Sequence, residues 1–102
     1  MSKVKAPNIA RGKRLFMLGQ VAATPGALDL LDRTATNAID LLCRHQRGDW
    51  GTLPPEDAAA NLRSIDEGCR ILSSYFLNAE ERIWIITEAD RSVTTLLLPS
   101  EY

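Results

Sequence analysis

The only histidine of the chain, His45, lies in residues 44–51 (RHQRGDWG), a segment rich in side chains that do chemistry. Because the pKa of histidine is ordinarily near neutrality, His45 is a candidate general base beside two arginines and Asp49. Its structural alternative is a histidine that bonds the last free carbonyls of a helix. Trp50 either stacks on a ligand or folds back over the core. We take Asp49 and Trp50 as candidate binding residues.

A second polar cluster, residues 87–92 (TEADRS), follows a stretch rich in strand-forming residues. In a phosphate or phosphodiester site, Arg91 would bind the anion, Glu88 would act as acid or base, and Ser92 would assist binding. In a tight turn, Asp90 would instead cap backbone amides while Arg91 pairs with Glu88 at the surface. Both interpretations stay open, with Glu88 and Arg91 as catalytic candidates beside His45.

The two cysteines, Cys43 and Cys69, do not form a convincing metal site. Zinc needs four ligands, and only these thiols and His45 are available at suitable positions. We therefore expect no metal and two partly buried thiols in a reducing compartment.

Three helices are predicted between residues 24 and 68. Thr24 is suited to cap a helix that begins at Pro25 and runs to about residue 33. Asn37 is suited to cap a second helix that reaches about residue 46. A third begins at the proline- and acid-rich residues 54–57 and ends at Gly68.

The last third of the chain has the two-residue period of strands, over residues 70–77, 82–89 and 93–99. Short turns between them predict an antiparallel meander, and residues 15–24 give a weaker strand signal. We predict an α+β fold in the order β(weak)-α-α-α-β-β-β, with the helices packed on one face of a small antiparallel sheet.

Alternation predicts the two faces of the middle strand. Ile83, Ile85 and Thr87 should share one face, and Trp84, Ile86 and Glu88 the other. Core or half-core packing is the expected role of Tyr75 and Trp84, and a cross-strand aromatic pair is the alternative.

Charge divides the chain unevenly. Residues 1–14 hold five basic residues and no acidic one, whereas residues 15–102 hold seven basic and thirteen acidic residues. We predict a flexible basic arm over residues 1–14 and a single domain over residues 15–102. The hydrophobic share of 45% argues against disorder. No stretch resembles a signal peptide or a membrane span, so we expect a cytoplasmic protein with no membrane partner.

Residues 21–28 (VAATPGAL), 44–51 and 82–102 (RIWIITEADRSVTTLLLPSEY) together resemble a family of short bacterial proteins met on plasmids and other mobile elements. The resemblance covers residues 15–102 and implies a compact single domain with no known chemistry. Some similar proteins carry the label plasmid-related protein or type I restriction subunit M. A chain of 102 residues cannot hold a methyltransferase domain, and no glycine-rich cofactor loop follows a strand.

Two classes of function follow. The first is a non-enzymatic binding or accessory protein that engages a macromolecule, protein or nucleic acid, through a sheet face or the Trp50 loop. The second is a small metal-independent ribonuclease of the barnase or RelE-like kind, by analogy of fold. The acidic body disfavours an RNA-binding role, so we rank the binding protein first, with no cofactor.

Overall fold

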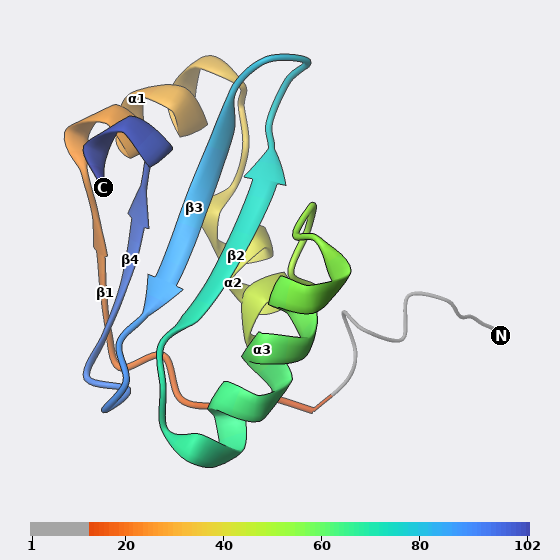
Figure 1. Ribbon diagram of the computed structural model, residues 1–102. Coiled ribbons are helices and arrows are strands. Elements are labelled where there is room, and N and C mark those ends of the chain that lie inside the picture. Colours follow the sequence, from red (N-terminus) through yellow and green to blue (C-terminus); the bar gives the residue numbers. More distant parts are fainter. Residues whose placement is uncertain (1–12) are drawn as a thin grey trace, which may run out of the picture.

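The computed structural model describes residues 13–102, and Figure 1 shows their course. The elements are β1 Gln20–Ala23, α1 Pro25–Arg33, α2 Ala38–Gln46, α3 Pro55–Glu67, β2 Ile71–Phe76, β3 Arg82–Thr87, β4 Val93–Leu97 and the short 3₁₀ helix η1 Pro99–Glu101. This is an α+β fold in the predicted order. Most of the predicted basic arm lies outside the described residues, and its last two members, Lys13 and Arg14, are exposed.

Local signals place the helix ends. The hydroxyl of Thr24 accepts a hydrogen bond from the amide of Ala27 at 3.1 Å and so caps α1. The side chain of Asn37 caps α2 by accepting from the amide of Ile39 at 2.9 Å. Gly68 ends α3 in the left-handed conformation, with φ 71°. All three predicted ends are confirmed.

The four strands form one sheet in the order β1-β4-β3-β2. Strands β2, β3 and β4 make the predicted antiparallel meander. Strand β1 lies beside β4 and parallel to it, so the sheet is mixed rather than wholly antiparallel. A parallel neighbour needs a long connection, and here three helices and two strands separate β1 from β4.

The two faces of β3 differ as predicted. Ile83, Ile85 and Thr87 have no exposed surface and point toward the helices. Trp84 lies on the opposite face. Tyr75 packs in the core as expected, and the alternative of a pair with Trp84 is wrong, because Tyr75 is opposite Ile83 in the register. Side chains alternate along a strand, so Tyr75 points to the helices and Trp84 away from them.

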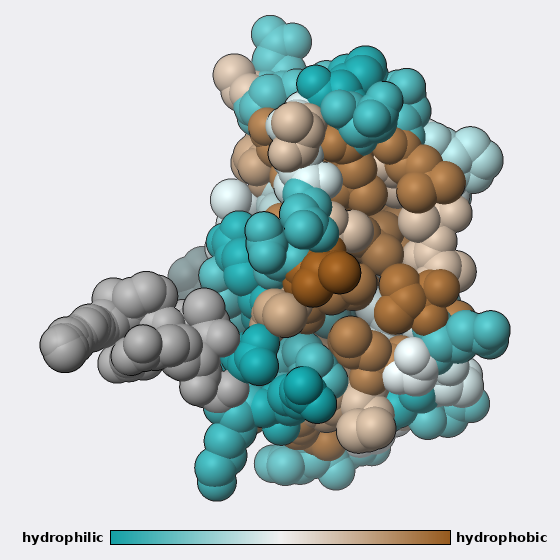
Figure 2. All heavy atoms as spheres, turned by 180° about the vertical axis from the view of Figure 1, so that it is seen from behind, coloured by the Kyte–Doolittle hydropathy of each residue, from teal (hydrophilic) through white to brown (hydrophobic). Residues whose placement is uncertain are grey.

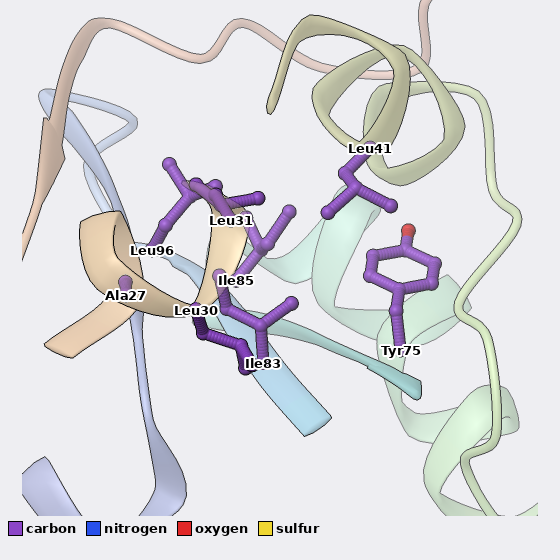
Figure 3. Close-up of a cluster of buried hydrophobic side chains, with 8 residues drawn as sticks. All are labelled: Ala27, Leu30, Leu31, Leu41, Tyr75, Ile83, Ile85 and Leu96. Atoms are coloured by element: carbon purple, nitrogen blue, oxygen red, sulfur yellow. The ribbon is translucent and has the colours of Figure 1, made fainter. Parts of the chain in front are cut away.

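Figure 3 shows the main hydrophobic cluster, which joins α1 and α2 to the helix-side face of the sheet. Its members are Ala27, Leu30, Leu31, Leu41, Tyr75, Ile83, Ile85 and Leu96. A second cluster of Phe16, Trp50 and Ile71 packs against partly buried residues that include Ala58 and Ile65 of α3. Both clusters lie on the helix side of the sheet, while Ile86 and Leu97 of the other face are also buried, at 6% and 7% exposure.

Helix α3 runs beside strand β2 (Figure 1), and its Ala58 and Ile65 pack against the cluster that contains Ile71 of the helix-side face. The side-chain amide of Asn61 donates to the carbonyl of Leu72 at 2.6 Å and accepts from its amide at 3.1 Å. These two bonds satisfy main-chain groups at the outer edge of β2. The opposite face of the sheet is left without an α-helix among residues 13–102.

Candidate functional site

His45 belongs to a buried polar network that crosses the sheet. Its Nδ1 lies 2.5 Å from the hydroxyl of Ser73, and its Nε2 lies 2.9 Å from that of Thr87. The Thr87 hydroxyl is 2.7 Å from that of Thr94, which donates to the carbonyl of Leu18 at 2.7 Å. Helix α2, three strands and the segment before β1 are therefore tied together.

The directions of these bonds follow from the carbonyl at the end of the chain. Because the single hydroxyl proton of Thr94 goes to a carbonyl, Thr87 must donate to Thr94. Nε2 of His45 must then carry the proton that Thr87 accepts. Nδ1 is left as an acceptor for Ser73, so the neutral Nε2–H tautomer satisfies every group in the network.

This environment keeps His45 uncharged. Burial lowers the pKa of its imidazole from 6.5 to about 3, and the side chain has no exposed surface. Both ring nitrogens are bonded inside the protein, so His45 has no contact with solvent through which it could act as a general base. It also does not bond the carbonyls at the end of α2, which was its alternative structural role. Its role in this fold is internal.

Trp50 is 7% exposed and lies in the core. Its ring stacks on Phe16 at a centroid distance of 6.3 Å and meets His45 edge-on at 6.0 Å. This matches the interpretation of a tryptophan folded back over the core, not that of a loop residue that stacks on a ligand. Phe16 is the residue on which Trp50 stacks, and the sequence analysis assigned it no contact because it lies in a segment with only a weak strand signal.

The other residues of the RHQRGDWG segment hold the same loop in place. The carboxylate of Asp49 pairs with Arg44 at 2.5 Å and accepts from the amide of Gly51 at 3.2 Å. The hydroxyl of Tyr75 donates to the carbonyl of Asp49 at 2.5 Å, and the Arg44 guanidinium lies 4.5 Å from the Tyr75 ring centroid. Asp49 is therefore engaged within the fold rather than directed to a ligand.

Gly51 allows the close approach of this loop to β2, and its replacement is expected to be costly. It has φ 76°, and a Cβ there would overlap the carbonyl of Ser74. We expect Gly51→Ala to lower the free energy of unfolding by about 2–3 kcal/mol. Gly68→Ala is the matched control, because φ is 71° there and a Cβ would meet nothing within 4 Å. It should cost about 1 kcal/mol. Equal losses in urea unfolding of the two variants would refute the steric explanation.

Arg91 bonds main-chain carbonyls. Its Nη1 donates to Cys69 at 2.6 Å, to Glu88 at 3.0 Å and to Ala89 at 3.1 Å, while its Nη2 donates to Ser64 at 2.8 Å. The guanidinium thus joins the end of α3 to the turn between β3 and β4. Arg91 itself has φ 61°, in the left-handed region. These bonds leave the side chain committed to the fold rather than to an anion.

Glu88 does not pair with Arg91, contrary to the predicted turn pair. Its carboxylate accepts from Arg70 Nε at 3.1 Å instead. The amide of Ser92 donates to the side chain of Asp90 at 3.0 Å, as expected for a tight turn. The Phe16 ring lies 5.8 Å from the Arg91 guanidinium and 5.2 Å from the His45 ring, so both of these candidates lie against the same core aromatic side chain.

Metal-ligating side chains do not gather in this fold. Within residues 13–102, no three His, Cys, Asp or Glu side chains are placed to hold a metal ion. Cys43 is partly buried and Cys69 is exposed, and both are free thiols. In the same part of the chain, no helix has the length and apolarity required to cross a bilayer.

The face of the sheet without an α-helix, which we call the helix-free face, carries a second set of apolar residues, of which Ile86 and Leu97 are buried and Phe76 is exposed. The register places on it, from β2, β3 and β4, Leu72, Phe76, Trp84, Ile86 and Leu97. Phe76 is 49% exposed, with the Arg82 guanidinium 5.8 Å from its ring centroid. Figure 1 shows none of α1, α2 and α3 over these strands, with only the short η1 beside the end of β4, whereas Figure 2, seen from behind, shows the side that carries α1 and α2.

A hollow of about 260 Å³ is centred on this face, lined by Arg70, Leu72, Trp84, Ile86 and Tyr102. The Tyr102 ring meets Trp84 edge-on at a centroid distance of 5.7 Å. Arg70 Nη1 donates to the Tyr102 hydroxyl at 2.6 Å. We call this set the Trp84 hollow. None of its residues was a candidate in the sequence, since an apolar residue on a strand has the same signature on either face.

The chain matches no family model, no curated protein and no solved structure. The resemblance to short bacterial proteins of mobile elements, based on three segments, stays a prediction. The structure defines a class only at the level of fold: an α+β protein with a four-stranded mixed sheet, helices α1 and α2 behind it and α3 along one edge.

Proposed function

We propose that the protein is a non-enzymatic binding module that engages a partner protein through the helix-free face of its sheet. One observation carries this proposal: Leu72, Trp84 and Ile86 on that face line a hollow, the Trp84 hollow, that none of the helices α1, α2 and α3 covers. Apolar surface that is open and hollowed is typical of interaction sites. The Trp50 loop, the other candidate surface, is buried.

Charge favours a protein over a nucleic acid. Residues 15–102 contain thirteen acidic and seven basic side chains. The predicted anion ligand, Arg91, is engaged with main-chain carbonyls, and Arg70 is paired with Glu88. The ribonuclease-like alternative loses His45 as a base because this side chain is inside the core, and its other candidate, Glu88, is paired with Arg70.

The cellular setting is part of the same proposal. The resemblance to short proteins of bacterial plasmids and other mobile elements suggests a bacterial setting, and we place the protein in the cytoplasm. The free thiols of Cys43 and Cys69 are compatible with that reducing compartment.

A peptide selection tests the proposal. Random peptides displayed on phage are selected on the full chain, and the enriched peptides are synthesised for affinity measurement. We expect Trp84→Asn and Phe76→Asn to weaken their binding about tenfold or more, since aromatic residues dominate binding energy at such surfaces. Phe76 is half exposed, so its variant should keep the fold even if Trp84→Asn does not.

Ile39→Asn is the matched control, because Ile39 is a 64% exposed apolar residue on α2. Its variant should bind the selected peptides as the parent does. Peptides that lose affinity with Ile39→Asn and keep it with both sheet-face variants would contradict the proposal. So would a selection that yields no peptide able to distinguish the parent from Phe76→Asn.

A further inference from the structure

We propose that the Trp84 hollow is a receptor for one aromatic side chain of the partner protein, held against Trp84 and Tyr102 with its face beside Arg70. This inference rests on the proposed function and specifies the residue that the partner inserts. Three properties of the hollow favour an aromatic side chain: its size, its lining and the Tyr102 ring at its rim.

The size of the hollow suits one amino-acid side chain better than a whole small molecule. The volume of about 260 Å³ is below the roughly 300 Å³ at which small-molecule sites usually begin. It is sufficient for a single large side chain. The lining is apolar from Leu72, Trp84 and Ile86, and Arg70 supplies the charged group.

Tyr102 indicates which side chain fits. Its ring is 69% exposed, yet it is held by two contacts that an incoming aromatic ring would also make. One is the edge-on packing against Trp84, and the other is the Arg70 guanidinium 5.8 Å from the ring centroid. The hollow lies beside Tyr102, so the partner's ring would pack next to Trp84 and Tyr102 and would not displace the Tyr102 ring.

Arg70 has capacity for that second ring. Its bonds within the described chain use Nε for Glu88 and Nη1 for Tyr102. Nη2 makes no hydrogen bond to residues 13–102, so this part of the planar group is available to a ligand. A guanidinium attracts the face of an aromatic ring but gains nothing comparable from an aliphatic side chain. The hollow should therefore prefer an aromatic residue to leucine.

Blocked amino acids test this preference directly. The full chain, ¹⁵N-labelled, is titrated with N-acetyl-tryptophanamide, N-acetyl-tyrosinamide, N-acetyl-phenylalaninamide and N-acetyl-leucinamide. We expect the three aromatic ligands to shift the NMR signals of the Trp84 indole N–H and of the backbone N–H groups of Leu72 and Ile86. Leucinamide should bind about fivefold more weakly. Arg70→Gln should reduce this ratio, and Tyr102→Leu should weaken the aromatic amides while leaving the fold intact.

Equal affinity for leucinamide and the aromatic amides would overturn the inference while leaving the proposed function standing. Absence of shifts at the hollow with every amide would also overturn it. Shifts that change on dilution of the protein alone would show a second copy in the hollow and would likewise refute it. The proposed function fails separately, through the comparison of Phe76→Asn with Ile39→Asn.

Discussion

Lowering the pH from 7 to 5 is expected to remove about 2 kcal/mol from the free energy of unfolding, through His45 alone. Its pKa is about 3 in the folded protein, because of burial, against 6.5 when exposed. Between these values the unfolded chain binds more protons than the folded one, so stability falls as the pH falls. The slope is about 1.4 kcal/mol per pH unit once the pH is below 6.5.

Urea unfolding measured at several pH values between 7 and 5 checks this expectation, because histidine is the side chain that ordinarily titrates in this range. His45 is the only histidine. The pKa values of Glu81, Asp90 and Glu101 are lowered, chiefly by hydrogen bonds from Arg33, Ser92 and Thr24 respectively, so these carboxylates titrate below this range. His45→Gln should remove the slope. If that variant does not fold, the parent's imidazole should still show no NMR titration between pH 7 and 5. Titration of that ring near pH 6.5 would contradict the account.

Arg91→Ala is expected to cost about 2–3 kcal/mol, well above the ~0–1 kcal/mol of a surface ion pair. The substitution removes a guanidinium that bonds four carbonyls, including those of Ser64 and Cys69 at the end of α3. Alanine keeps the backbone strain of this left-handed position, so the loss reports on the side chain. Chemical denaturation provides the measurement.

Arg63→Ala is the control for Arg91→Ala, because Arg63 is an exposed arginine of α3. Its loss should change stability by less than about 0.5 kcal/mol. If both variants have the same stability, Arg91 makes no net contribution and its role as a link between α3 and the turn is wrong.

Local features of the sequence were sufficient for the helices and the meander. Thr24 and Asn37 cap their helices with bonds to amides two or three residues away, and such short-range contacts can be inferred from residue type and order. The alternation of Ile83, Ile85 and Thr87 likewise needs no knowledge of the rest of the chain.

The hydrogen-bond partners of the polar side chains lie far away in the sequence, so they could not be inferred from the sequence alone. Arg91 has the composition of a turn residue or an anion ligand, and its true partners include Ser64, far back in α3. His45 lies at the end of a helix, but the direction of its ring is fixed by Ser73 and Thr87 on two strands. The pairing of β1 with β4 also joins opposite ends of the sequence.

Which residues lie on each face of the sheet could be assigned only from the pairing of the strands. Tyr75 and Trp84 are equally good strand residues, and only the pairing of Tyr75 with Ile83 shows that they point in opposite directions. Which face α1 and α2 cover is likewise a property of the whole fold. The Trp84 hollow therefore became visible only in three dimensions.

An NMR titration tests the central claim that the helix-free face binds a partner while the two polar clusters serve the fold. The ¹⁵N-labelled full chain is titrated in parallel with a selected peptide and with a short RNA at low salt. The account predicts peptide-induced shifts centred on Leu72, Trp84 and Ile86, and no specific shifts with RNA. Shifts centred on residues 44–51 and 87–92, with either ligand, would contradict it.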